Sequence, residues 1–296
     1  MYDNKNLLPR HQILQSDIDI PYKNVEDLFI EKEKQNPGKI FLICPGKRED
    51  SFSFENFMGE YRLVAKYLLH LGLAKGDRFN LIFSNSSEFL LFYFAGLTLG
   101  ITVVPINPDL APEEMRYVIN DSQSKAVFYQ SELHYKIEQI INKISPDTIL
   151  EAMQHIPNFE PLLLNNSEIG ELSIPDINLV DEAVIIYTSG TTGYPKGVVL
   201  SHLNLLADAK AISEWFQFTT ETRTLCILPL FHNNGQITTL LAPLYAGGST
   251  VIVKGKTSLM SYWSFVEKYK ITWTSVMTSI LSILLSIPKE RNDKTL

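Results

Sequence analysis

Residues 185–202 read Ile-Ile-Tyr-Thr-Ser-Gly-Thr-Thr-Gly-Tyr-Pro-Lys-Gly-Val-Val-Leu-Ser-His, an apolar run that leads into a stretch of hydroxyls, glycines and one lysine. Phosphate oxygens accept many hydrogen bonds, and glycines such as Gly197 let backbone N–H groups approach them closely. The pattern therefore predicts a buried strand over 184–187, followed by a loop that binds polyphosphate. We expect Tyr187 to pack at the end of the strand and Pro195 to stiffen the loop. The candidate phosphate-binding residues are Thr188, Ser189, Gly190, Thr191, Thr192, Gly193 and Lys196.

Other glycine-rich motifs fit this stretch less well. A Walker loop requires G-x-x-x-x-G-K-[ST], whereas Lys196 follows a proline and precedes a glycine. The segment Gly255-Lys256-Thr257 comes closer, but Thr250 stands where the first glycine is required. The dinucleotide fingerprint G-x-G-x-x-G is also missing from the loop. A merely flexible loop would explain the glycines, but not the four hydroxyls and the lysine beside them.

A second motif follows about thirty residues further on, at Leu228-Pro-Leu-Phe-His-Asn-Asn-Gly235. With the run 187–197, it resembles the adenylate-forming (AMP-binding) superfamily, which includes acyl-CoA synthetases, luciferases and the adenylation domains of peptide synthetases. The resemblance extends along the whole chain. In that family the second motif borders the carboxylate-binding pocket. The resemblance therefore implies a substrate pocket formed by His232, Asn233, Asn234 and Gly235.

His232 has two interpretations. A lone histidine is often a buried side chain whose hydrogen bonds are satisfied by backbone groups. Here the histidine follows Phe231 and precedes two asparagines and a glycine, in a segment that matches the pocket motif. We therefore favour a role in positioning the substrate carboxylate or gating an acyl tunnel, rather than a role as a base. His202 directly follows Ser201 at a predicted helix start, and we expect it to support that cap.

The resemblance also implies elements that these 296 residues do not contain. Family members continue with a Tyr-Gly-x-Thr-Glu element that holds adenine and the metal, an Asp that binds the ribose, a hinge, and a small C-terminal lid with the catalytic lysine. We expect this chain to be the N-terminal portion of such an enzyme, truncated and inactive alone. No catalytic residue and no metal ligand can then be assigned within it. The missing C-terminal part of the same enzyme would be its partner.

Bulk composition favours a cytoplasmic enzyme and disfavours nucleic-acid binding. The net charge is −7, whereas nucleic acid requires a basic surface. Cys44 and Cys226 lie in apolar stretches without metal-type spacing, so we expect buried free thiols in a reducing compartment. The polar N-terminus has no apolar core of a signal peptide. The resemblance to lipid-handling enzymes leaves peripheral association with membranes open.

The uncharged run 89–106 raises the question of a membrane span, but a helix and a strand explain it better. Ser86 and Ser87 can cap a helix that ends at Gly100, and the β-branched residues 101–104 then favour a buried strand. Further helices are expected at 57–71 with Ser53 as cap, after Pro112, over 133–144, and from Ser201 to Trp215. Further strands are expected at 79–83, 126–129 and near Ile149, with a surface loop over 155–181.

This alternation predicts an α/β fold with largely parallel sheets covered by helices. By resemblance, two stacked lobes follow an N-terminal arm over 1–20. The first lobe spans 73–202 and ends in the phosphate loop, and the second combines 21–72 with 203–296. The C-terminal lid is absent. The second lobe would then have an unfinished sheet, whose open apolar edge favours aggregation.

The resemblance implies ATP-dependent activation of a carboxylic acid to an acyl-adenylate and then to a CoA thioester. ATP, Mg²⁺ and coenzyme A would be the cofactors and co-substrates. Relatives that activate amino acids place an Asp in the second motif to pair with the ammonium group, and this motif has none. A fatty or aryl acid is therefore favoured, most of all a fatty acid. Two alternatives stay open: a ligase that loads the acyl group onto a carrier protein, and a non-catalytic remnant that binds a nucleotide or a partner.

Overall fold

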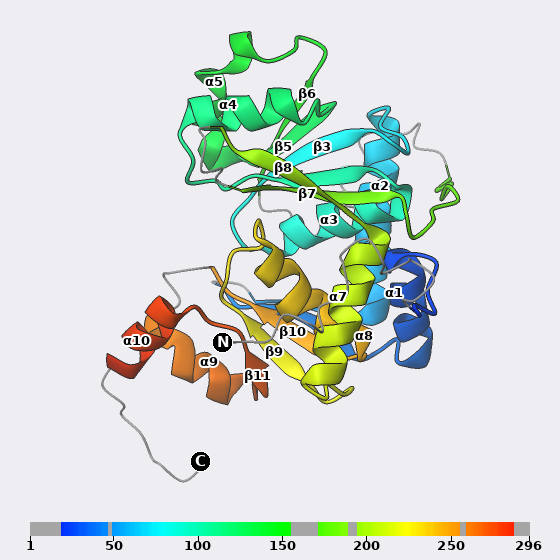
Figure 1. Cartoon of the computed structure of the whole chain (residues 1–296), viewed down its shortest axis with the longest axis vertical. Coiled ribbons are helices and arrows are strands. Elements are labelled where there is room, and N and C mark those ends of the chain that lie inside the picture. Colours follow the sequence, from blue (N-terminus) through cyan, green and yellow to red (C-terminus); the bar gives the residue numbers. More distant parts are fainter. Residues whose placement is uncertain (1–18, 47–48, 155–170, 189–193, 255–258, 287–296) are drawn as a thin grey trace, which may run out of the picture.

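The computed structural model confirms the predicted fold class, mixed α/β with two helix-covered, largely parallel sheets (Figure 1). It describes residues 19–46, 49–154, 171–188, 194–254 and 259–286. The strands are β1 (Ile40–Cys44), β2 (Asp50–Ser53), β3 (Arg78–Ile82), β4 (Thr102–Pro105), β5 (Ala126–Gln130), β6 (Ile149–Met153), β7 (Glu182–Thr188), β8 (Lys196–Ser201), β9 (Arg223–Cys226), β10 (Ser249–Ile252) and β11 (Trp273–Thr274). The helices are α1 (Val25–Gln35), α2 (Phe54–His70), α3 (Ser87–Leu99), α4 (Pro112–Asp121), η4 (Ser131–Leu133), α5 (His134–Glu138), η5 (Ile141–Lys143), α7 (His202–Trp215), η6 (Asn234–Leu241), α8 (Ala242–Tyr245), α9 (Tyr262–Lys268) and α10 (Thr278–Ser286).

The upper sheet in Figure 1, called sheet B here, has the strand order β6-β5-β3-β4-β7-β8. Neighbouring strands from β6 to β7 are parallel, whereas β8 runs antiparallel to β7. Helix α3 packs in the apolar cluster between the two sheets, while Met115 and Val118 of α4 pack in a separate cluster on the outer face. The carboxyl ends of β3, β4, β5, β6 and β7 therefore lie at one edge of the sheet, where open α/β sheets bind ligands.

The lower sheet, called sheet A, has the order β11-β9-β10-β1-β2 and joins two segments that are far apart in sequence. Strands β11, β9, β10 and β1 are parallel, and β2 pairs antiparallel with β1. The expectation of parallel sheets thus holds except at the edge strands β2 and β8. At the other edge, β11 has two residues, and α10 exposes Leu281, Ile283 and Leu285. Aggregation through this edge stays a prediction.

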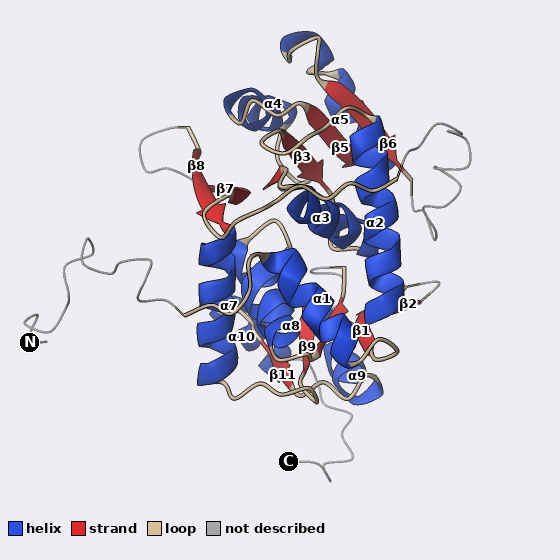
Figure 2. Cartoon of the chain, turned by 90° about the vertical axis from the view of Figure 1, so that its right-hand side faces the viewer, coloured by secondary structure: helices blue, strands red, loops and turns tan. Residues whose placement is uncertain are grey.

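Helix α3 fills the space between the sheets, and its residues Ser87–Leu99 are all buried (Figures 1 and 2). The Ser86 hydroxyl accepts the Phe89 N–H at 3.3 Å, and the helix ends at Gly100 with φ 65°, a left-handed conformation that glycine adopts without strain. The run 89–106 is therefore a buried helix followed by β4, as predicted. Within the described residues, no helix is long and apolar enough to cross a membrane.

The helix expected over 133–144 is wrong, because the chain there forms η4, the short α5 and η5. The backbone N–H groups of Ile140 and Lys143 bond three residues back, to Ile137 and Ile140, rather than four. Asn142 and the β-branched isoleucines in this stretch have weak helix propensity. Ile137, Ile140 and Ile144 are buried, but their spacing does not sustain a long helix.

The two cysteines are buried and free, as predicted. Burial raises the pKa of the Cys226 thiol to about 12 and raises that of Cys44 as well. Both thiols are therefore protonated at neutral pH, and neither is an activated nucleophile.

His202 connects α7 to α1 instead of supporting the α7 cap, so that expectation is wrong. The cap is formed by Ser201, whose hydroxyl accepts the Asn204 N–H, with the Asn204 side chain reaching back to the Ser201 N–H. The fully buried His202 ring accepts the Val25 N–H at Nδ1, at 3.3 Å. Burial lowers the pKa of His202 to about 4, and the nearby Asp181 carboxylate opposes that shift only in part.

We predict that the free energy of unfolding decreases as the pH falls from 6.5 towards 4, because the unfolded chain binds a proton at His202 before the folded chain does. Protonation of His202 lowers the free energy of unfolding by at most about 3 kcal/mol over this range. Chemical denaturation between pH 7 and pH 4 measures it. His202→Asn should flatten the profile, whereas His70→Asn, at the exposed end of α2, should not. Identical slopes for wild type and His202→Asn would contradict the assignment.

Candidate functional site

Strands β7 and β8 form a hairpin whose connection contains the predicted phosphate loop. Thr188 ends β7, Lys196 begins β8, and the two residues are paired across the hairpin. Paired residues of an antiparallel ladder project to the same side, so these two exposed side chains share one face. Ile186, which packs between the sheets, lies on that same face. The other predicted loop residues lie outside the described residues: Ser189, Gly190, Thr191, Thr192 and Gly193.

The opposite face of the hairpin packs against α4 through Tyr187. Its hydroxyl donates to Asp121 Oδ2 at 2.6 Å, and burial together with this bond raises the pKa of Tyr187. A Cβ at Gly197 would lie 2.9 Å from Ile185 Cγ2 and 3.1 Å from the Tyr187 ring. Tyr187 therefore packs at the strand end, as predicted, and Gly197 has a packing role that the sequence analysis did not foresee.

The second motif forms a turn after β9 that leads into the π-helix η6. The His232 N–H donates to the Pro229 carbonyl at 3.1 Å. The His232 side chain is exposed, its ring packs 4.6 Å from that of Phe231, and partial burial lowers its pKa. A buried histidine is thus the wrong interpretation. Asn233 and Asn234 are exposed beside it, so three of the four predicted pocket residues face solvent together.

Gly235, the fourth predicted pocket residue, is buried beneath this turn. A Cβ there would lie 2.4 Å from the Pro229 carbonyl oxygen, a contact that backbone atoms cannot relieve without a shift. Glycine at this position therefore lets η6 start directly against the turn that holds His232.

Asn85 joins the two sheets at their carboxyl edges. Its buried carboxamide follows β3 and donates to the carbonyls of Leu228, at 3.0 Å, and Val253, at 3.2 Å. Its Oδ1 accepts the Leu230 N–H at 2.8 Å. The carboxyl ends of β3, β9 and β10 thus meet. Because β7 is parallel to β4 and β4 to β3, the phosphate loop leaves sheet B at this same edge. Nothing in the sequence around Asn85, a polar residue between an apolar strand and an apolar helix, predicts that it joins the two sheets.

A cavity of about 470 Å³ opens at this shared edge. Residues at or just beyond the carboxyl ends of strands in both sheets line it: Cys44, Phe83, Gln130, Met153 and Ile252. Asp50, Glu88, Glu132 and Lys254 add charged groups. Among the described lining residues there is none from the β7–β8 hairpin or the His232 turn. The cavity is adjacent to the candidate site through Asn85, rather than part of it.

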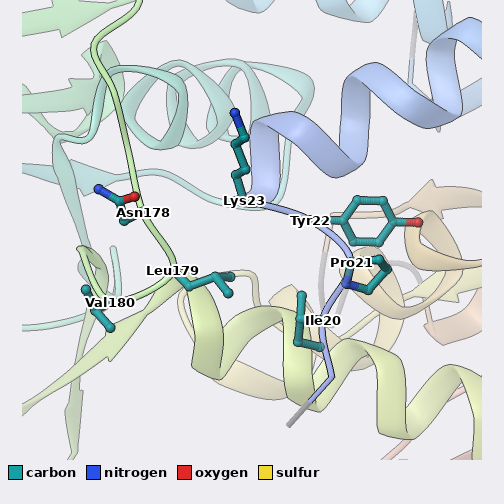
Figure 3. Close-up of a pocket in the computed structure, with 7 residues that line it drawn as sticks. All are labelled: Ile20, Pro21, Tyr22, Lys23, Asn178, Leu179 and Val180. Atoms are coloured by element: carbon teal, nitrogen blue, oxygen red, sulfur yellow. The ribbon is translucent and has the colours of Figure 1, made fainter. Parts of the chain in front are cut away.

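A second cavity, of about 460 Å³, lies elsewhere (Figure 3). Residues 20–23, before α1, face residues 178–180, before β7, and Leu179 points towards Ile20. Because residues 178–180 precede β7, this cavity is at the amino end of the strand that carries the phosphate loop at its carboxyl end. It is not a candidate for the site.

Over the described ranges, no group of three or more His, Cys, Asp or Glu side chains is arranged to hold a metal ion. The site as described therefore consists of an exposed hydroxyl and ammonium on the hairpin, and an exposed imidazole with two amides on the turn. Such groups donate hydrogen bonds to anionic oxygens.

We predict that Gly235→Ala lowers the free energy of unfolding by about 1–3 kcal/mol, because the added methyl overlaps the Pro229 carbonyl. Gly59→Ala is the matched control: this glycine lies within α2 with open space around its Cβ position. There, alanine should stabilise by about 0.5–1 kcal/mol. Urea denaturation of both variants measures the difference. Equal stabilities would contradict the close packing under the turn.

Solved structures with similar folds are adenylate-forming enzymes. The N-terminal domain of FACL13 from Mycobacterium tuberculosis, solved with an inhibitor, matches 90% of this chain and 66% of its own, with 26% identity and a TM-score of 0.76. A long-chain-fatty-acid CoA ligase from Rhodopseudomonas palustris matches in fold, with a TM-score of 0.79 and 21% identity over 92% of this chain and 67% of its own. The fold is that of the N-terminal core of adenylate-forming enzymes.

The AMP-binding enzyme family matches residues 29–295, and the chain belongs to that family. A crotonobetaine/carnitine–CoA ligase of Shigella dysenteriae is 30% identical over 86% of this chain and 51% of its own length. An oxalate–CoA ligase of Arabidopsis thaliana is 29% identical over 76% of this chain and 44% of its own. The chain thus spans about half the length of the curated relatives that it matches. The predicted family resemblance is confirmed.

Proposed function

We propose that this chain takes part in the ATP-dependent activation of a carboxylic acid to an acyl-adenylate and then to a CoA thioester, as part of a longer enzyme. The pairing of Thr188 with Lys196 at the neck of the β7–β8 hairpin carries the proposal, because it places a hydroxyl and a fixed positive charge on one face at the carboxyl edge of sheet B. The motif Tyr187–Gly197 and membership of the AMP-binding family support it.

The chemistry explains why a phosphate loop is needed. A carboxylate is a weak electrophile, and joining it to AMP creates a good leaving group while pyrophosphate departs. Negative charge then grows on the departing phosphates. Lys196, Thr188 and the backbone N–H groups of the loop would stabilise that charge in the transition state. The proposed phosphate contacts therefore also include Ser189, Gly190, Thr191, Thr192 and Gly193.

Mg²⁺ fits this proposal through the substrate phosphates, with its protein ligand expected from the family's Tyr-Gly-x-Thr-Glu element rather than from these residues. It binds with few carboxylates plus substrate phosphate oxygens, and keeps several waters. Its chemistry would be to neutralise phosphate charge, while Lys196 orients the triphosphate.

We propose that the acid lacks an α-amino group and is a fatty acid. His232, with its pKa lowered, is neutral at pH 7 and can donate a hydrogen bond to a carboxylate without acting as a fixed charge. Asn233 and Asn234 add neutral donors, and the turn carries no carboxylate to pair with an ammonium. The acids in the names of similar proteins are all carboxylic acids. Two curated relatives are named as CoA ligases of crotonobetaine/carnitine and of oxalate, and one solved structure is named as a CoA ligase of long-chain fatty acids.

The acceptor is the second part of the proposal. Coenzyme A is favoured, because the curated relatives that match are CoA ligases. The catalytic alternative is loading of the acyl group onto a carrier protein. The non-catalytic alternative is a remnant that binds a nucleotide or a partner.

We further propose that residues 73–202 form one lobe and that 21–72 with 203–296 form the other. We also propose that the chain works in the cytoplasm or at membrane surfaces.

We predict that Lys196→Ala weakens binding of Mg·ATP by about ten-fold or more, because a charge-assisted contact to phosphate is lost. Isothermal titration of ATP into wild type and variant measures this. Lys34→Ala, which removes an exposed lysine at the end of α1, is the charge-matched control and should bind as the wild type does. Equal affinities for Lys196→Ala and wild type would remove Lys196 from the site.

We also predict that this chain alone catalyses no carboxylate-dependent exchange between pyrophosphate and ATP, although it binds ATP. The reason is that the adenine, ribose and lid elements expected from the family do not occur in its sequence. Radiolabelled pyrophosphate exchange, with fatty acids of several lengths, tests this. Exchange by the chain alone would contradict the predicted inactivity.

A version extended with the family's C-terminal elements separates the two acceptors. Formation of a coenzyme A thioester supports coenzyme A, and transfer to a phosphopantetheine arm supports a carrier protein.

A further inference from the structure

Helix α4 contacts the hairpin that carries the phosphate loop at two places, Tyr187 in β7 and Tyr194 two residues before β8. The ring of Tyr117 on α4 stacks on the ring of Tyr194, with centroids 4.7 Å apart and planes at 15°. One turn later, Asp121 accepts the Tyr187 hydroxyl at 2.6 Å. Tyr117 and Asp121 are four residues apart and therefore lie on one face of the helix. That face meets the hairpin on either side of residues 189–193.

The Tyr194 ring owes its position to this stack. Its side chain is 72% exposed, so little else surrounds it. Tyr117, by contrast, packs against the outer apolar cluster that also contains Met115 and Val118 of its own helix. Desolvation and the nearby Asp121 carboxylate raise the pKa of Tyr117. The Tyr117 ring on α4 thus holds the exposed Tyr194 ring, two residues before β8.

Tyr187 is fixed just as specifically. The Tyr187 ring covers Gly197, where a Cβ would lie 3.1 Å from the ring, and the Tyr187 hydroxyl donates a hydrogen bond to Asp121. The hairpin is therefore tied to α4 on the β7 side by a hydrogen bond and on the β8 side by a ring stack. Thr188 directly follows the first tie and Lys196 lies two residues after the second, and the two residues are paired across the hairpin.

We propose that Tyr117 and Asp121 are positioning residues that hold Tyr187 and Tyr194, the residues on either side of the phosphate loop, in place for binding of a triphosphate. The four residues Tyr117, Asp121, Tyr187 and Tyr194 are called the tyrosine clasp. The proposal rests on the proposed function of the loop. A loop whose ends are fixed loses less conformational entropy when the nucleotide binds, so the clasp strengthens ATP binding without touching ATP.

The first test needs no nucleotide. Amide hydrogen exchange of the peptide 186–198 is measured in wild type, Tyr117→Ala, Tyr194→Ala and the double variant. The clasp predicts faster exchange in each single variant, and no further increase in the double variant, because both remove the same contact. Tyr117→Phe keeps the stack and should restore much of the protection. Trp215→Ala, which removes an 82% exposed aromatic at the end of α7, should leave the peptide unchanged. Unchanged exchange in Tyr117→Ala, or additive effects, overturns the clasp.

The second test measures the dissociation constant of Mg·ATP for the same variants. Loss of the stack should raise it about 2- to 10-fold, with Tyr117→Phe closer to wild type and Trp215→Ala equal to it. Urea denaturation should give the same global stability for Tyr194→Ala as for wild type. If exchange changes but ATP affinity does not, the clasp is structural only and the positioning role fails. If the wild type does not bind ATP, the proposed function fails, while the exchange experiment still decides whether the clasp exists.

Discussion

The Asn85 carboxamide is the interaction on which the arrangement of the site depends. It is buried, and it donates to backbone carbonyls after β9 and β10 while it accepts from the Leu230 N–H. A buried amide with these bonds satisfied is stable, whereas one left without them is strongly unfavourable. This single side chain from sheet B therefore fixes the turn of sheet A that carries His232. The proposed function requires the phosphate loop and the His232 turn to act on one ligand, and the Asn85 contacts bring the edges of the two sheets that carry them together.

Much of this could be predicted from the sequence, because the relevant signals are local. The strand over 184–187, the caps at Ser53, Ser86 and Ser201, and the stop at Gly100 each follow from a few neighbouring residues. The alternation of helix and strand then gives the fold class. Membership of the family follows from two short motifs in the expected order.

What the sequence did not reveal depends on contacts between distant residues. Nothing near Tyr117 indicates that its ring meets Tyr194, and nothing near His202 indicates that it bonds to Val25 at the start of α1. Gly197 and Gly235 were assigned to ligand contact by motif. Their Cβ positions, however, are occupied by Ile185 and Tyr187 in one case and by the Pro229 carbonyl in the other. Glycines in a ligand-binding motif can therefore be required by packing, and the structure is needed to separate the two reasons.

A structure of this chain crystallised with Mg²⁺ and a non-hydrolysable ATP analogue tests the central claim most directly. We predict triphosphate density against residues 188–196, with the Lys196 ammonium in contact with a phosphate oxygen and the nucleotide between the hairpin and the His232 turn. The contradicting result is an unliganded hairpin with the triphosphate bound elsewhere. The two other places are the cavity between residues 20–23 and 178–180 and the cavity beside Cys44 and Met153.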